Sequence, residues 1–105
     1  MNANISSYIA PLAYTGDRET AHHRLLALLS RLPRVTIVDT DPVFIHAEFR
    51  SRLFQFVDDV LFHFPEKENQ IHLRSSSRKG YWDLGANRRR LEHIRRLFMK
   101  SEKTC

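Results

Sequence analysis

The sequence contains a single cysteine, and it is the last residue. The thiol of Cys105 has no partner for an internal disulfide, and a cysteine-based zinc site needs more than one thiol. Such sparse cysteine usage is typical of a reducing compartment. The fold must therefore rest on a hydrophobic core. Hydrophobic residues make up 42% of the 105 positions and include seven phenylalanines, which is enough for one domain.

Long hydrophobic runs are also absent. No segment approaches the run of about 20 apolar residues that spans a bilayer. The start of the chain lacks the basic residues and the apolar stretch of a signal peptide. We therefore expect a cytoplasmic protein with one domain over residues 1–105, frayed at 1–7 and 100–105.

Signatures of common catalytic and nucleotide-binding sites are missing as well. The chain has no P-loop spacing, no His-Glu-x-x-His pair, no helix-turn-helix, no zinc finger and no RNP motif. Three histidines and a glutamate on predicted strands would bind zinc only if they converged, and their spacing does not support this. We predict solvated strand side chains, no metal site and no cofactor. These residues are His46, Glu48, His63 and His72.

Charge is distributed unevenly along the chain, whose net charge is +5. Residues 1–71 hold seven Lys/Arg and nine Asp/Glu, a net of −2, and residues 72–105 hold ten and three, a net of +7. The basic part can attract nucleic acid, an acidic protein or an anionic small molecule, or it can be a solvated helix face. Nucleic-acid binding has weak support, because only Tyr81 and Trp82 could stack on bases and the arginines surround the helix. The arginines are Arg88, Arg89, Arg90, Arg95 and Arg96.

The leucine-rich segment after Gly16 predicts a helix. Asp17 can act as the N-cap, since its carboxylate can accept a free backbone N–H, and Pro33 ends the helix. His22 and His23 occupy adjacent positions that face different ways, and we predict both at the surface. One apolar stripe has the helical period. It consists of Ala21, Leu25, Leu28, Leu29 and Leu32.

A second helix is predicted from Leu84 or Ala86 to Met99. Asp83 and Asn87 could each cap it, and Asp83 is favoured because Asn87 then falls on the apolar stripe. That stripe consists of Leu84, Asn87, Leu91, Ile94 and Phe98.

Five extended segments complete the prediction. The clearest is Val43–Arg50, where odd-numbered residues are apolar and even-numbered ones mostly polar, as in a strand with one buried face. Asp39–Pro42 is predicted as a turn and Ser75–Tyr81 as a polar loop. Short links favour antiparallel neighbours, so we predict an α+β fold with a sheet of four to five antiparallel strands and two helices packed on one face. The other strands are predicted at Tyr8–Leu12, Val35–Val38, Phe56–Phe64 and Ile71–Ser75.

The most distinctive stretch is residues 74–90, RSSSRKGYWDLGANRRR, and it resembles the signature of the domain-of-unknown-function family DUF1499. The segments at 51–59 and 11–17 also fit, so the resemblance covers nearly the whole chain. The resemblance implies one α+β domain and a shared polar set, and it implies no reaction. That set is Arg52, Asp58, Asp59, Arg74, Ser75, Ser77, Arg78, Gly80, Asp83, Gly85, Asn87 and Arg88.

The loop before the second helix has the composition of an anion site. A helix N-terminus offers free N–H groups and partial positive charge. Arg78 precedes that terminus, Arg88 lies just inside it, and Ser75 and Ser77 add hydroxyl donors. We predict a non-enzymatic binding or scaffold module whose Arg/Ser loop engages an anionic small molecule or an acidic protein.

Two alternatives remain open. In the structural one, Asp83 caps the helix and pairs with Arg78, while the two adjacent aspartates pair with Arg52 or Arg74. In the enzymatic one, Asp58 or Asp59 acts with Arg78 on an anionic substrate. Neighbours on a strand point to opposite faces, so the aspartates cannot form a close acid–base dyad without a bulge. The candidate residues are Arg52, Asp58, Asp59, Arg74, Ser75, Ser77, Arg78, Asp83, Asn87 and Arg88.

Overall fold

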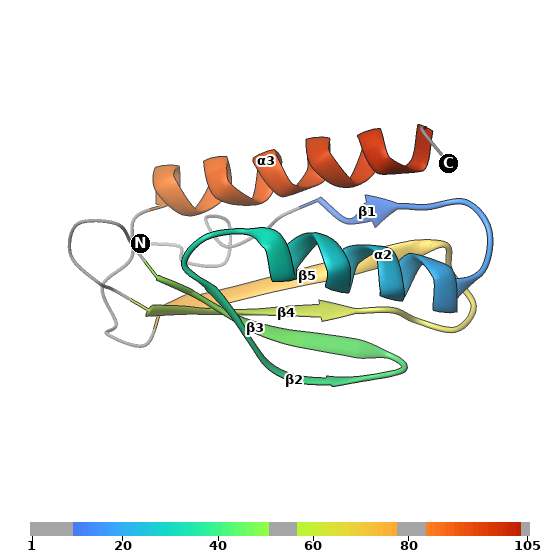
Figure 1. Cartoon of the computed structure of the whole chain (residues 1–105), viewed down its shortest axis with the longest axis horizontal. Coiled ribbons are helices and arrows are strands. Elements are labelled where there is room, and N and C mark those ends of the chain that lie inside the picture. Colours follow the sequence, from blue (N-terminus) through green and yellow to red (C-terminus); the bar gives the residue numbers. More distant parts are fainter. Residues whose placement is uncertain (1–9, 51–56, 78–83, 104–105) are drawn as a thin grey trace.

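The computed structural model describes residues 10–50, 57–77 and 84–103, which form an antiparallel sheet with two helices on one face (Figure 1). The sheet order is β1-β5-β4-β3-β2. The predicted α+β class is confirmed. In chain order the elements are β1 (Leu12–Ala13), α2 (Arg18–Arg31), β2 (Val35–Asp41), β3 (Phe44–Arg50), β4 (Val57–His63), β5 (Gln70–Ser77) and α3 (Leu84–Lys103).

Helix α2 begins where the sequence predicts. The side chain of Asp17 accepts from the backbone N–H of Thr20 at 3.3 Å and from the Thr20 hydroxyl at 2.8 Å. The Thr20 hydroxyl, and after it the Thr20 backbone N–H, holds the pKa of Asp17 below its usual value. Gly16 before the cap has φ +84°, which favours glycine. The helix ends at Arg31 with Leu32 as C-cap, just before Pro33.

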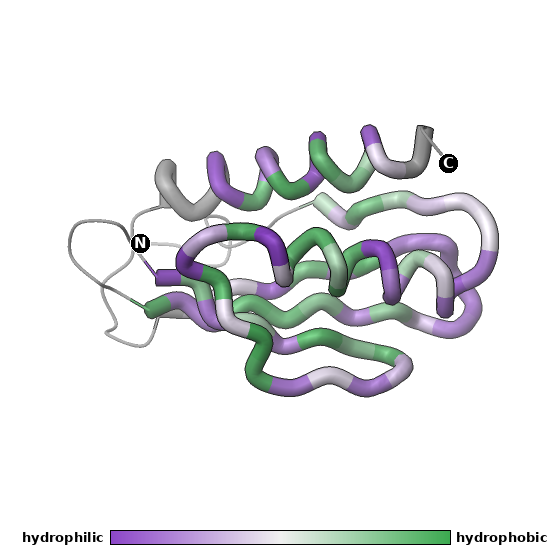
Figure 2. The backbone as a smooth tube through the Cα atoms, in the orientation of Figure 1, coloured by the Kyte–Doolittle hydropathy of each residue, from purple (hydrophilic) through white to green (hydrophobic). Residues whose placement is uncertain are grey.

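A single core lies between the helices and the sheet. The inward side chains of β3, β4 and β5 are buried against Leu25 and Leu29 of α2 and against Leu91, Ile94 and Phe98 of α3. Figure 2 shows the same alternation of hydrophobic and hydrophilic positions along the strands. Because both helical stripes share one cluster with one face of the sheet, the opposite face is left without a helix. Neither described helix combines the length and apolarity needed to cross a bilayer.

Strand β2 contains a β-bulge that the sequence did not predict. Ile37 pairs with Ala47, but Asp39 pairs with His46, so Val38 is one extra residue. The predicted turn at Asp39–Pro42 is wrong, because the strand continues to Asp41. The bulge shifts the alternation by one residue. It therefore turns Asp39 and Asp41 outward and places Thr40 on the helix-covered face.

Two further boundaries differ from the prediction. Ser75–Ser77 belong to β5 and not to a loop, and α3 continues past Met99 to Lys103. The first strand is Leu12–Ala13, so the predicted segment Tyr8–Leu12 meets it only at Leu12; Ala10 and Pro11 are not in a strand, and residues 8 and 9 lie outside the described residues.

Arg95 of α3 ties the helix to the segment before β1. Its guanidinium donates to the carbonyl oxygens of Pro11, at 2.8 Å, and Ala10. Through this contact the C-terminal helix holds both the core and the start of the described chain.

Candidate anion-binding site

A pocket of about 340 Å³ opens between the end of α2, the paired ends of β2 and β3, and the side of α3. We call it the basic pocket, because four of its nine lining residues carry guanidinium or imidazole groups and none carries a carboxylate. It is lined by Leu32, Pro33, Arg34, Val35, Phe49, Arg50, Arg90, His93 and Ile94.

Arg34 enters the pocket from the link between α2 and β2. Its φ is +61°, a left-handed conformation that is uncommon for a residue with a side chain. The strand pairing holds it there, since the backbone N–H of Arg50 donates to the Arg34 carbonyl at 2.9 Å. Glycine would adopt this backbone at lower cost, so an arginine here keeps a cation at the pocket despite local strain.

Arg90 contributes a guanidinium held by two contacts. Its Nη1 donates to Oδ2 of Asp58 at 3.2 Å, and its plane lies over the ring of Phe49, 5.3 Å from the centroid. Only 25% of the Arg90 side chain and 14% of the Asp58 side chain are exposed. Asp58 therefore fixes the orientation of Arg90, and it is not one of the residues that line the pocket.

Arg50 and His93 also belong to the lining. Arg50 ends β3, but the strand alternation turns its side chain to the open face, where Nη2 lies 3.6 Å from Oε1 of Glu48. His93 lies three residues after Arg90, which places both on the same side of α3. Planar guanidinium groups bind carboxylate and phosphate oxygens with paired N–H donors, so the arrangement suits an anionic ligand.

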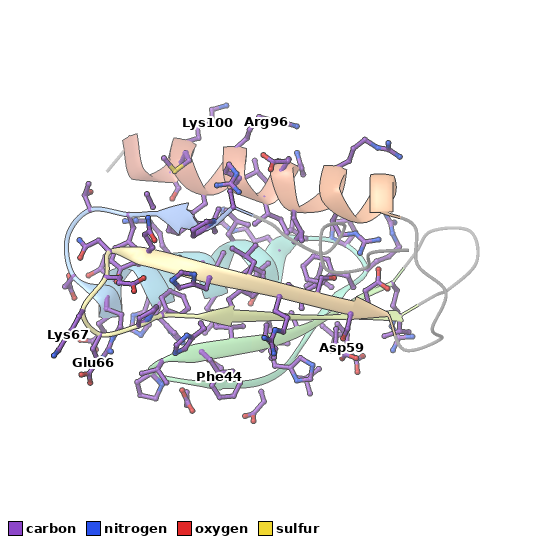
Figure 3. The ribbon with its side chains drawn as sticks, turned by 180° about the vertical axis from the view of Figure 1, so that it is seen from behind. Phe44, Asp59, Glu66, Lys67, Arg96 and Lys100 are labelled. Atoms are coloured by element: carbon purple, nitrogen blue, oxygen red, sulfur yellow. The ribbon has the colours of Figure 1, made fainter. Side chains whose placement is uncertain are left out.

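The adjacent aspartates point to opposite faces of the sheet, as the strand period requires. Asp58 faces the helices and bonds to Arg90, whereas Asp59 lies on the open face and its Oδ1 is 2.9 Å from Nε2 of His46. Figure 3 shows Asp59 and Phe44 on that face, away from the helices. The two carboxylates therefore do not form a shared acid–base dyad.

The serines that were predicted in a loop lie in strand β5. Ser75 is a buried residue of β5 on the helix-covered face, so it cannot serve as a loop donor for a ligand. Ser77 is the last residue of that strand, opposite Asp58 in the register. Arg74 is exposed on the open face, on the other side of the sheet from the basic pocket.

Several predicted site residues cannot be compared with the structure. Arg52, Arg78 and Asp83 lie outside the described residues. Asn87 and Arg88 belong to the first turns of α3, but their side chains are outside the described part. The predicted capping of α3 by Asp83 thus stays a prediction.

The open face of the sheet carries the histidines that the alternation places there. His63 stands opposite His72 in the register, and Nε2 of His72 lies 2.7 Å from Oε1 of Glu68. Across residues 10–50, 57–77 and 84–103, no group of three or more His, Cys, Asp or Glu side chains is arranged to hold a metal ion.

His22 is not at the surface, contrary to the prediction. Only 8% of it is exposed, its ring lies against Phe64, and Nε2 is 3.1 Å from the Thr40 hydroxyl. That hydroxyl donates its proton to the Phe44 carbonyl at 3.2 Å, so His22 donates to Thr40 through Nε2–H. The bulge in β2 makes this contact possible, because it turns Thr40 inward.

A second pocket of about 330 Å³ surrounds His22 at the other end of α2. Side chains of both signs line it, Arg18 against Glu19 and Asp41. This mixture favours no particular ligand charge, so the basic pocket is the better candidate.

Three pocket residues were not predicted from the sequence: Arg34, Arg50 and His93. Arg90 was predicted only as one of the arginines around the helix. A signal was available for Arg90, which directly precedes the buried Leu91 and so borders the apolar stripe. No sequence signal joins Arg34 to Arg50, because their proximity depends on the pairing of β2 with β3.

Comparison with known proteins gives a family and no activity. No curated protein and no solved structure matches the chain. The family described as "Protein of unknown function (DUF1499)" matches residues 2–98, which includes every element described above except the end of α3. The protein therefore belongs to the DUF1499 family.

Proposed function

We propose that this protein is a binding module for a small anion and that the basic pocket is its site. The observation that carries the proposal is a pocket whose lining includes Arg34, Arg90 and His93 and no carboxylate.

The left-handed backbone at Arg34 supports a binding role for its side chain. Among the described residues, no hydrogen bond or ion pair joins the Arg34 guanidinium to the fold, so the fold does not explain the arginine. A ligand would explain it, because a charge-assisted hydrogen bond contributes about 1.5–3 kcal/mol. Strained residues that persist in folded proteins are concentrated at binding sites.

The enzymatic alternative has less support. It requires Asp58 or Asp59 to act with Arg78 on a substrate, but Asp58 is bonded to Arg90 and Asp59 lies 2.9 Å from His46 on the open face. Asp58 is engaged by Arg90, which suits a positioning role better than proton transfer. Binding without chemistry agrees with these contacts.

The test compares inorganic phosphate and sulfate binding by the full chain and by Arg34→Gly, using calorimetry and thermal unfolding. Glycine removes the cation and relieves the strained backbone, so we expect binding to weaken at least tenfold while the unfolding temperature does not fall. If the anion binds in the basic pocket, the loss of one charge-assisted contact should weaken its binding about tenfold. If the anion binds elsewhere, Arg34→Gly should not change its affinity.

Arg96→Gln is the matched control, since Arg96 is exposed on α3 and points away from the sheet (Figure 3). It removes the same charge without touching the pocket, and we expect the affinity of the parent protein. Equal weakening in both variants would indicate general electrostatic attraction and would count against a site.

A further inference from the structure

We propose that the ligand of the basic pocket is an amphiphilic organic anion, with one carboxylate or phosphate group and a short hydrocarbon part. This inference rests on the proposed anion-binding function and adds the ligand class. The observation behind it is the second half of the pocket lining, which is apolar. These residues are Leu32, Pro33, Val35, Phe49 and Ile94.

The apolar lining combines core and surface. Phe49 and Ile94 are almost fully buried, while Leu32 and Val35 are partly buried and pack against the core cluster. The pocket thus continues outward from the core and is not merely a patch of charged side chains. An inorganic anion would leave the exposed parts of Leu32, Pro33 and Val35 in contact with water, whereas a hydrocarbon group would cover them.

The volume limits the ligand size. The pocket measures about 340 Å³, which lies near the lower end of the range for small-molecule sites. Binding pockets for small molecules start at about 300 Å³, so this pocket suits a small ligand and is too small for a full-length lipid chain.

The positions of Arg34 and Arg90 in the pocket support a ligand with one anionic head group. Arg90 is oriented by Asp58 and Phe49, so one guanidinium group is positioned before a ligand arrives. Arg34 borders the apolar residues along the chain, because it lies between Pro33 and Val35. A ligand that satisfies the guanidinium groups would therefore place its chain against Val35 and its neighbours.

The experiment measures binding of acetate, butanoate, hexanoate and octanoate to the full chain by calorimetry at constant ionic strength. Inorganic phosphate is the anion without a chain, and hexanol is the chain without an anion. We expect affinity to rise about fourfold for each added methylene until the pocket is full. We expect hexanol to bind at least tenfold more weakly than hexanoate.

Val35→Thr separates the apolar contribution from folding, because threonine keeps the shape and the strand preference of valine. In Val35→Thr, the fourfold gain in affinity for each added methylene should become smaller, while the affinity for acetate stays the same. Val38→Thr, on the same strand but outside the pocket, is the matched control and should leave the whole series unchanged.

The outcomes distinguish the two proposals. If phosphate and all carboxylates bind with equal affinity at every chain length, the proposal of an amphiphilic ligand is wrong and the proposal of an anion site stands. Hexanol binding as tightly as hexanoate would also overturn it. No binding of any anion would overturn the proposed function and this inference together. A chain-length increment lost in Val35→Thr and kept in Val38→Thr supports the ligand class.

Discussion

Arg90 and Asp58 join helix α3 to strand β4 on the core side of the sheet, with 3.2 Å between Nη1 and Oδ2. Both side chains are mostly buried. Removing the carboxylate leaves a partly buried guanidinium without its acceptor. We therefore expect Asp58→Ala to lower the free energy of unfolding by about 2 kcal/mol, measured by urea denaturation.

The control for this change is Arg89→Ala, an exposed arginine next to Arg90 on the same helix, which should stay within about 0.5 kcal/mol of the parent. A double-mutant cycle of Asp58→Ala with Arg90→Ala should give a coupling energy of at least about 1 kcal/mol. A coupling near zero would mean that the ion pair does not hold the helix to the sheet.

The contact between His22 and Thr40 should also be measurable. Thr40→Val removes the acceptor of the buried Nε2–H and the donor to the Phe44 carbonyl while keeping the β-branched shape. We expect a loss of about 1–2 kcal/mol in the free energy of unfolding. Thr36→Val, on the open face of the same strand, should be nearly neutral. Equal effects of the two changes would contradict the inward placement of Thr40.

Asp17 makes the stability depend on acid pH. Hydrogen bonds from Thr20 lower the pKa of Asp17 in the folded state below the reference value of 3.8. Its stabilising contribution is therefore complete above about pH 3.8 and is lost as the pH falls through the lower folded pKa. In Asp17→Asn this contribution is absent, because asparagine does not titrate.

The measurement is the unfolding temperature of both proteins between pH 5 and pH 2. The difference between parent and variant should shrink as the pH falls. Thr20→Val, which removes the hydroxyl donor and keeps the backbone N–H, should fall between them. Parallel curves for parent and Asp17→Asn would show that the N-cap carboxylate does not contribute to the acid dependence.

Hydrophobic periodicity was sufficient for most of the fold. The alternation in Val43–Arg50 predicted β3 and its buried face, and the stripes through Leu25 and Leu91 predicted the helix faces that reach the core. The prediction was wrong at Asp39, where two aspartates would have faced inward in a regular strand. A bulge resolved that conflict, and a bulge depends on the pairing partner, which the sequence does not show.

The candidate site was less predictable for a similar reason. Arg34 lies in the link before β2, Arg50 at the end of β3 and Arg90 in α3, and the fold brings them to the lining of one pocket. The motif around residues 74–90 led to the correct helix but placed serines in a loop where the chain forms a strand. Local composition led to the prediction of an anion site in the loop before α3, whereas the position of the basic pocket depends on tertiary contacts.

The bulge at Val38 also affects how copies of the protein meet. β2 is an edge strand, and 47% of Val38 is exposed, which in a regular strand would invite another chain to add to the sheet. The extra residue interrupts the evenly spaced N–H and carbonyl groups, and the outward Asp39 and Asp41 add repulsion between identical edges. Deleting Val38 would keep every other β2 side chain on its present face and restore an uninterrupted edge. We expect that variant to remain folded and to self-associate in light scattering, and we expect the parent to stay monodisperse at the same concentration.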